Sequence, residues 1–187
     1  PVGRIAGFIN PRYNQKTGHR LCRFGYIDFI NDLEVSKALL DAVAAWGREH
    51  GMDSLAGPLG MTDLDYEGTL TEGFDQLSTM STIYHYPYYV DHFAAYGMEV
   101  DAQWNEYVIP IPDQLTDKHE QVAAFVRSRY GLRSFSETSR TRLREKWGHK
   151  IFELLNEAYS PLYCVSELDD NQIQYYIDLY LPLLRLD

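Results

Sequence analysis

The sequence predicts an α/β domain, with a mixed sheet flanked by helices and followed by a helical segment. Two short apolar runs rich in β-branched and aromatic residues open the chain, and a strongly amphipathic stretch follows them directly. Further short apolar runs then alternate with helical patterns, an order typical of a sheet covered by helices. The chain has 187 residues, of which 45% are hydrophobic, so it is long enough to bury a core.

The first part of the chain supplies the predicted sheet. Residues 2–9 and 22–30 are expected to be strands, and the second is apolar on both faces, as in a strand covered from both sides. The polar residues 10–20 between them predict a loop. Residues 54–57 form a short third strand that ends before a Pro and a Gly.

The first helix is expected over residues 33–50. Asn31 and Asp32 are suited to accept the free N–H groups of its first turn, and Glu34 lies three residues after Asn31, in capping-box spacing. Gly51 supplies the left-handed residue that ends the helix. The apolar stripe consists of Val35, Leu39, Val43 and Trp46.

The middle of the chain is dominated by a long connection over residues 61–83. Connections of this length inside a domain often carry function. A second helix is expected over 87–96 and ends at Gly97. Two strands are then predicted, at 98–100 and 104–111.

The last part of the chain is predicted to be mainly helical. Asp117 and Glu120 have capping-box spacing and begin one helix, and residues 132–136 are a candidate strand. An amphipathic helix follows over 143–158. A last helix, capped by Ser166 with Asp169, carries the apolar stripe Ile173, Tyr176, Ile177, Tyr180 and Leu184.

Composition excludes several classes of function. The formal net charge of −10 argues against a nucleic-acid surface, and the basic stretch over 127–146 reads as a solvated helix face. Cys22 and Cys164 have neither disulfide-framework nor metal-ligand spacing. Without an apolar run of about 18 residues or a signal peptide, the chain is expected to be cytoplasmic with no membrane partner. Its two ends lie directly against a strand-like run and a helical pattern, so we expect an internal fragment of a longer protein.

Several segments resemble one family, the GNAT superfamily of N-acetyltransferases. The helix ALLDAVAAWGREHGM and the later YYVDHFAAYGMEV resemble the latter half of a GNAT domain. More specifically, the chain is similar to uncharacterised tandem-GNAT proteins of Bacteroidetes-type bacteria. The segments that carry this second resemblance are GPLGMTDLDYEGTLTEGFD at 57–75, TIYHYPYY at 82–89, YGLR at 130–133 and IFELLNEAYSPLY at 151–163.

The resemblance implies a tandem arrangement and an activity. Residues 1–112 correspond to the latter part of a degenerate GNAT-like unit, and residues 113–187 to a connecting helix with the opening strand and helices of a second unit. The intact parent is then expected to transfer an acyl group from acetyl-CoA or another acyl-CoA to a small-molecule amine acceptor. The alternative is a non-catalytic GNAT-fold module kept for binding or for formation of a homodimer, because a fold alone does not determine function.

The residues predict no cofactor site within this chain. GNAT enzymes place Q/R-x-x-G-x-G/A between the central strand and its helix, where backbone N–H groups bind the pyrophosphate. The matching residues 30–38 lack glycine and place Asp32 and Glu34 where the anion would lie. The tyrosine that often serves as general acid would stand four residues before Gly97, and Phe93 stands there instead. No catalytic residue is therefore assigned.

The long connection holds the first candidate binding residues. The pattern Asp63-x-Asp65-x-Glu67 is similar to the start of a calcium loop, but Phe74 stands where the closing glutamate is required, so a solvated turn is favoured and no metal is expected. Asp65 and Glu72 are candidates to face the acceptor, because long loops often carry function.

Aromatic residues at 84–89 supply the second group of candidates. Tyr84 and Tyr89, in a cluster that includes His85, either line a substrate pocket or pack in the core, and the core interpretation is favoured. His92 follows His85 at a distance of two helical turns, with no third ligand for zinc in view.

Overall fold

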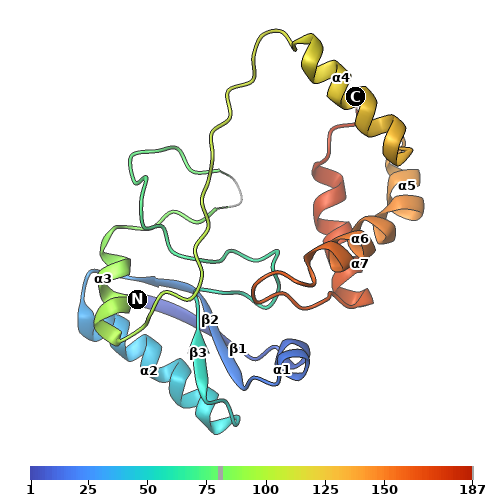
Figure 1. The fold of residues 1–187 in the computed structure, drawn as a ribbon. Helices are drawn as coiled ribbons and strands as arrows, with labels where there is room; N and C mark the ends of the chain where they lie inside the picture. Colours follow the sequence, from blue (N-terminus) through green and yellow to red (C-terminus); the bar gives the residue numbers. More distant parts are fainter. Residues whose placement is uncertain (80–81, 187) are drawn as a thin grey trace. The chain divides into compact units, whose positions relative to one another are not determined.

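Three strands form one mixed sheet in the computed structural model, which describes residues 1–79 and 82–186 (Figure 1). The strands are β1 (Gly3–Phe8), β2 (Leu21–Phe29) and β3 (Ser54–Ala56), in the spatial order β1-β2-β3. β1 pairs antiparallel with β2, and β2 pairs parallel with β3. These bounds confirm the three predicted strands and the α/β class.

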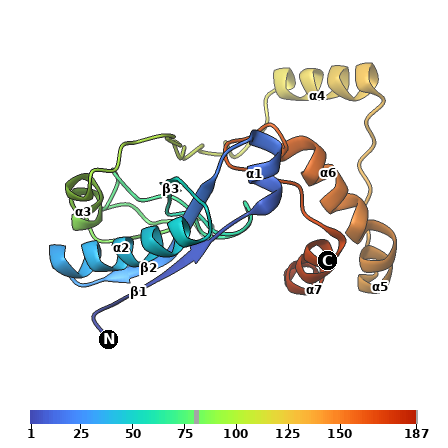
Figure 2. The same ribbon diagram turned by 90° about the horizontal axis from the view of Figure 1, so that it is seen from below.

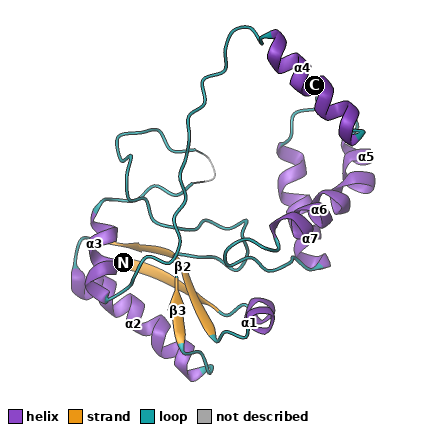
Figure 3. Cartoon of the chain, in the orientation of Figure 1, coloured by secondary structure: helices purple, strands orange, loops and turns teal. Residues whose placement is uncertain are grey.

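The chain divides into two compact units. Unit 1 comprises residues 1–101 and 152–170, and unit 2 comprises residues 102–151 and 171–187. All three strands lie in unit 1, and the helices of both units are seen in Figure 3. The predicted division at residue 112 concerns two GNAT-like units of a longer protein and stays a prediction.

A bulge interrupts the pairing of β1 with β2. Arg4 pairs with Asp28 and Ala6 with Gly25, so β2 holds one more residue than β1 over this stretch. Tyr26 lies in the bulge with φ 48°, a left-handed conformation that is uncommon for a residue with a side chain. The bulge separates β2 into a first part buried on both faces and a last part, around Asp28, that reaches the surface.

Helix α2 (Leu33–Glu49) lies along the sheet, as Figure 2 shows. Its N-cap is Asp32, whose side chain accepts a hydrogen bond from the Glu34 N–H at 2.9 Å. Asn31 was expected to share in a capping box, but its side chain instead contacts His92. The helix and strands enclose a core of Cys22, Phe24, Ile27, Phe29, Leu40, Val43, Tyr89 and Phe93.

Helix α3 (Tyr88–Tyr96) completes this core and confirms the second predicted helix. It ends at Gly97, which has φ 92°, where glycine is favoured. The Tyr88 hydroxyl donates to the Phe29 carbonyl at 2.6 Å. His92 joins α3 to the start of α2, with its Nδ1 atom 2.7 Å from the Ser36 hydroxyl. Helix α3 therefore contacts both the end of β2 and the start of α2.

The loop predicted over residues 10–20 is wrong, because α1 (Pro11–Thr17) forms there. Asn10 caps this helix by accepting a hydrogen bond from the Tyr13 N–H. Pro11 stands at the first helical position, where its missing N–H breaks no hydrogen bond within the helix. Gly18 ends the helix at φ 74°. The residues that begin and end this short helix, Asn10, Pro11 and Gly18, are equally typical of a turn.

The strands predicted at 98–100 and 104–111 are also wrong, because the described residues there form no ladder. Val108 is 97% exposed and Ile111 is 87% exposed. The alternating pattern is real, but a strand requires a partner whose N–H and C=O groups it can pair with. No described strand edge pairs with this segment.

Unit 2 contains most of the remaining helices. In chain order the elements are α4 (Asp117–Tyr130), α5 (Arg140–Arg142), the π-helix η1 (Leu143–Gly148), α6 (His149–Tyr159), α7 (Asp170–Tyr180) and the 3₁₀ helix η2 (Leu181–Leu183). Helix α6 passes into unit 1 at Phe152. The predicted strand over 132–136 is wrong, since those residues are irregular and mainly exposed.

The caps of two of these helices differ from the prediction. The capping box of α4 is formed by Thr116 with His119, one residue before the expected pair. Ser166 and Asp169 were expected to cap α7, but Ser166 accepts a hydrogen bond from Asn10 and Asp169 pairs with Arg12 at 2.9 Å. Both residues therefore bind the α1 region of unit 1. Among the described residues, no helix has the length and apolar character needed to cross a membrane.

Candidate functional site

The long connection begins by following β2 beyond the end of β3. The Leu59 N–H donates to the Phe24 carbonyl at 2.7 Å, and the Gly68 N–H donates to the Pro58 carbonyl at 2.8 Å. A side chain at Gly25 would place its Cβ 2.4 Å from the Leu59 carbonyl oxygen, so only glycine permits this close approach. The connection is thereby held against the middle strand of the sheet.

A buried arginine, Arg23 on β2, lies where several segments of unit 1 meet. Its Nη1 donates to the Gly60 carbonyl at 3.3 Å and its Nη2 donates to the Cys164 carbonyl at 2.7 Å. The guanidinium carbon lies 4.7 Å from the centre of the Tyr13 ring, in cation–π contact. Arg23 is only 2% exposed, and its Nε has no hydrogen-bond partner among the residues that the structure describes.

Two half-buried carboxyl groups of the connection are coupled to Arg23. Burial, together with the neighbouring carboxylate of Asp63, raises the pKa of Glu67 to about 7, while Arg23 opposes the shift. Burial also raises the pKa of Asp63, again against the effect of Arg23. Glu67 therefore exchanges a proton close to neutral pH, which is the property required of a general acid or base.

Asp65 holds the connection together rather than facing an open space. Its Oδ1 accepts a hydrogen bond from the Tyr26 hydroxyl at 2.9 Å, and its Oδ2 accepts one from the Thr62 N–H at 3.0 Å. A Cβ on Gly60 would lie 2.1 Å from that of Asp65, so the turn is tightly closed around this residue. Glu72, the other acidic candidate, is exposed on the same connection.

The two tyrosine candidates have different surroundings. Tyr84 is 52% exposed, and its hydroxyl donates to the Phe74 carbonyl. Tyr89 is 2% exposed and lies in the core of unit 1, where its hydroxyl donates to Asp28 at 2.7 Å. The hydrogen bonds of Asp65, Tyr84 and Tyr89 thus lead to three different parts of unit 1.

His85 is a second buried polar residue with a side-chain nitrogen that lacks a hydrogen bond in the described part of the chain. It is 7% exposed, and neither ring nitrogen has a hydrogen-bond partner among the described residues. Its ring centre lies 4.7 Å from that of Tyr89. Burial lowers the pKa of His85, while the carboxylate of Asp28 acts in the opposite direction. Burial therefore favours the neutral imidazole, in which one ring nitrogen carries a lone pair.

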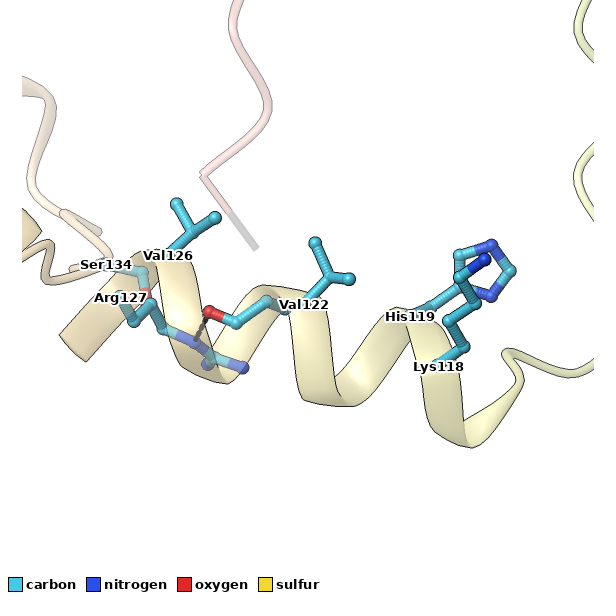
Figure 4. Close-up of a pocket in the computed structure, with 7 residues that line it drawn as sticks. Lys118, His119, Val122, Val126, Arg127 and Ser134 are labelled. Carbon is cyan, nitrogen blue, oxygen red and sulfur yellow. Dashed lines mark hydrogen bonds between the residues drawn. The ribbon is translucent and has the colours of Figure 1, made fainter. Parts of the chain in front are cut away.

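Unit 2 has a hollow along α4, seen in Figure 4. Helix α4 buries none of its residues, and Val122 on this face is 54% exposed. The polar side chains here do not converge on one point, so the hollow is a helix face rather than a reaction site. Its lining residues are Lys118, His119, Val122, Ala123, Val126, Arg127 and Ser134.

Arg23 and Asp28 were not selected from the sequence as candidate residues. The available signal was a charged residue within a strand whose apolar side chains fall on both faces, since such a charge requires a specific partner. The partners of Arg23 could not be inferred, because Cys164 lies 141 residues further along the chain. The described residues contain no group of three or more His, Cys, Asp or Glu side chains arranged to hold a metal.

Comparison with known proteins gives one partial similarity. Protein YghO of Escherichia coli (strain K12) is 35% identical over 100 residues, which cover 51% of this chain and 25% of that protein. The chain therefore matches about a quarter of the length of this relative. No family model matches the chain, and no solved structure matches it.

Replacement of Asp65 by Ala is expected to destabilise the fold. The change removes two hydrogen bonds, which corresponds to a loss of about 1–3 kcal/mol in the free energy of unfolding. The melting temperature should fall by about 2–4 °C for each 1 kcal/mol. Glu72→Ala, an exposed change on the same connection, is the control and should stay within about 0.5 kcal/mol. Equal melting temperatures for the two variants would show that Asp65 does not hold the turn.

Replacement of Glu67 by Gln should change how stability depends on pH. A folded-state pKa of about 7 lies above the usual glutamate value, so the contribution of Glu67 is fully present below about pH 4 and is lost as pH rises through 7. Gln imitates the protonated form of Glu67. The variant should therefore gain stability relative to the unmodified chain as pH rises from 4 to 8. Urea denaturation at several pH values measures this gain, with Glu72→Gln as control. A difference that does not vary with pH would contradict the assignment.

Proposed function

We propose that this chain is the acceptor-side part of a GNAT-like N-acyltransferase whose acyl-CoA is held by another part of a longer parent protein. The motifs at 57–75 and 82–89 support the family assignment through their resemblance to tandem-GNAT proteins. The sheet of unit 1 is compatible with it, since β2 runs directly into α2 and pairs in parallel with β3. The acceptor would be a small-molecule amine.

One observation supports placing the acyl-CoA site outside this chain: the first turn of α2 is already capped by its own Asp32 side chain. A helix that follows a strand offers free N–H groups to a diphosphate. Here the carboxylate of Asp32 accepts the Glu34 N–H, and residues 30–38 include no glycine to let a phosphate approach the backbone. Asp32 and Glu34 add two negative charges that would repel a phosphate group.

The proposed reaction requires this chain only to position the acceptor amine and to remove one proton from it. The amine nitrogen attacks the thioester carbonyl carbon, an N–C bond forms, the C–S bond breaks and the thiol of CoA leaves. The acceptor must first lose one proton, and most of the remaining rate enhancement comes from positioning. In unit 1, Glu67 has a pKa raised to about 7 and can accept a proton near neutral pH, and His85 has ring nitrogens without a hydrogen-bond partner among the described residues. The net charge of −10 favours the approach of a cationic amine.

Calorimetric titration with acetyl-CoA tests where the donor binds. This chain should show no saturable heat of binding, whereas the longer parent protein should bind acetyl-CoA with a saturable heat. The matched variant Asp32→Ala/Glu34→Gln removes the two carboxylates from the first turn of α2. Weak binding that appears only in this variant would support electrostatic exclusion. Saturable binding to the unmodified chain would refute the proposal that the donor lies elsewhere.

A second candidate function is a non-catalytic GNAT-fold module that forms a homodimer. It is favoured by one observation in unit 2, an irregular segment that exposes several large apolar side chains. Apolar side chains next to unpaired backbone groups can add to the edge of a sheet in another molecule. The side chains are Trp104, Tyr107, Val108, Ile109 and Ile111, which are 58–97% exposed.

Sedimentation equilibrium of the chain tests this second candidate. A dimer is expected, and Val108→Lys should weaken its association at least about tenfold, because a buried lysine without a partner is costly. Leu77→Lys is the control, since Leu77 is 98% exposed on the connection of unit 1. A chain that stays monomeric at high micromolar concentration, or a dimer that both changes weaken equally, would exclude this segment as the interface.

A further inference from the structure

The buried imidazole of His85 requires a hydrogen-bond partner that the described part of the chain does not supply. A buried polar group without a partner costs about 1–3 kcal/mol, so such groups in folded proteins are normally satisfied by protein, water or a bound ligand. Neither ring nitrogen of His85 has a hydrogen-bond partner among the described residues, and the residue is only 7% exposed. The residue is held against the core on the face of Tyr89.

The same tyrosine, Tyr89, also binds a carboxylate. The Tyr89 hydroxyl donates to Asp28 Oδ1 at 2.7 Å, so one tyrosine contacts both Asp28 and His85. The structure thus brings together a carboxylate at the end of β2 and a histidine just before α3.

Asp28 is open to solvent, whereas His85 is not. The Asp28 side chain is 66% exposed, and it forms a long ion pair of 4.0 Å with the Nε of Arg4, which is also exposed. An exposed pair of this length contributes little to stability and is readily exchanged for another cation. A cationic group is therefore able to reach Asp28 from solvent.

Two tyrosine rings near this end of β2 define the kind of cation that suits the carboxylate. The Tyr88 hydroxyl donates to the carbonyl of Phe29, the residue that follows Asp28, at 2.6 Å, which places the Tyr88 ring at this end of β2. The Tyr88 ring stacks on Tyr86 with centres 5.6 Å apart, and Tyr86 is 68% exposed. Aromatic faces beside a carboxylate favour an organic ammonium, which brings an apolar chain and a charge together. A hydrated metal ion would gain nothing from the rings.

We propose that Asp28 and His85 form the binding site for the acceptor amine. The ammonium group pairs with the Asp28 carboxylate, and its alkyl chain lies against Tyr86 and Tyr88. One ammonium proton then moves to a ring nitrogen of His85, which leaves a free R–NH₂ and an imidazolium. No bond to carbon changes in this step. The inference rests on the proposed N-acyltransferase function for the acyl transfer that follows, but amine binding is testable without it.

The test is a titration of the ¹⁵N-labelled chain at about pH 8 with hexylamine, followed by the ring resonances of His85. We expect saturable shifts with a dissociation constant in the millimolar range, typical of a ligand this small. Asp28→Asn should weaken binding at least about tenfold, and it retains an oxygen to accept the Tyr89 hydrogen bond. Asp75→Asn removes the same charge from an exposed position of the connection and should leave binding unchanged.

Two results would overturn the proposal. Equal shifts with hexan-1-ol would show apolar binding without recognition of the ammonium group. The absence of a saturable shift would show that water alone satisfies the His85 nitrogens. His85→Gln, measured by calorimetry with hexylamine, separates binding from proton transfer, because a glutamine amide can accept a hydrogen bond but cannot serve as the base. It should retain most of the affinity if Asp28 provides the anchor.

Assays on the parent protein separate failure of this inference from failure of the proposed function. If the parent transfers no acetyl group from acetyl-CoA to amines while hexylamine still binds at Asp28, only the N-acyltransferase function fails. If the parent is active and Asp28→Asn and His85→Gln leave its kcat/KM unchanged, only the assignment of the amine site fails. We expect His85→Gln to lower kcat at least about a hundredfold, as for loss of a general base.

Discussion

The burial of the Arg23 guanidinium is the constraint on which the rest of unit 1 depends. A charge taken out of water must be met by hydrogen bonds and nearby opposite charge. Arg23 meets the first need with the carbonyls of Gly60 and Cys164, which come from the long connection and from the segment after α6. One side chain thereby ties β2 to two distant parts of the chain, and the half-buried Asp63 and Glu67 supply the opposite charge.

The middle strand then presents two different chemical environments, one on each side of the bulge at Tyr26. Before the bulge, Arg23 is enclosed and the surrounding carboxyl groups serve mainly to balance it. After the bulge, Asp28 reaches the surface with only a long ion pair and a tyrosine hydroxyl to hold it. A ligand is thus more readily accommodated at the Asp28 end, while the Arg23 end supplies the rigidity that a binding site requires.

Local signals predicted the helices well and the strands only where a partner exists. Asp32 and the apolar stripe placed α2, and Gly97 placed the end of α3, because caps and stripes act within a few residues. The run at 104–111 has a strand-like pattern too, yet it pairs with no described strand. Helix α1 is not predicted from the sequence for a different reason, because a seven-residue helix has too few residues to show a helical repeat of apolar side chains.

The sequence by itself determined the α/β class, the main helices and the acidic, glycine-free turn before α2, because each depends on neighbours along the chain. Among the four candidate residues, it could not distinguish the surface position of Tyr84 from the core position of Tyr89. Tertiary structure decided that Asp65 closes a turn, that Arg23 reaches Cys164, and that His85 packs against the tyrosine that binds Asp28. These relations join residues separated by up to 141 positions. Burial and charge at such distances depend on how the segments pack, which no local pattern encodes.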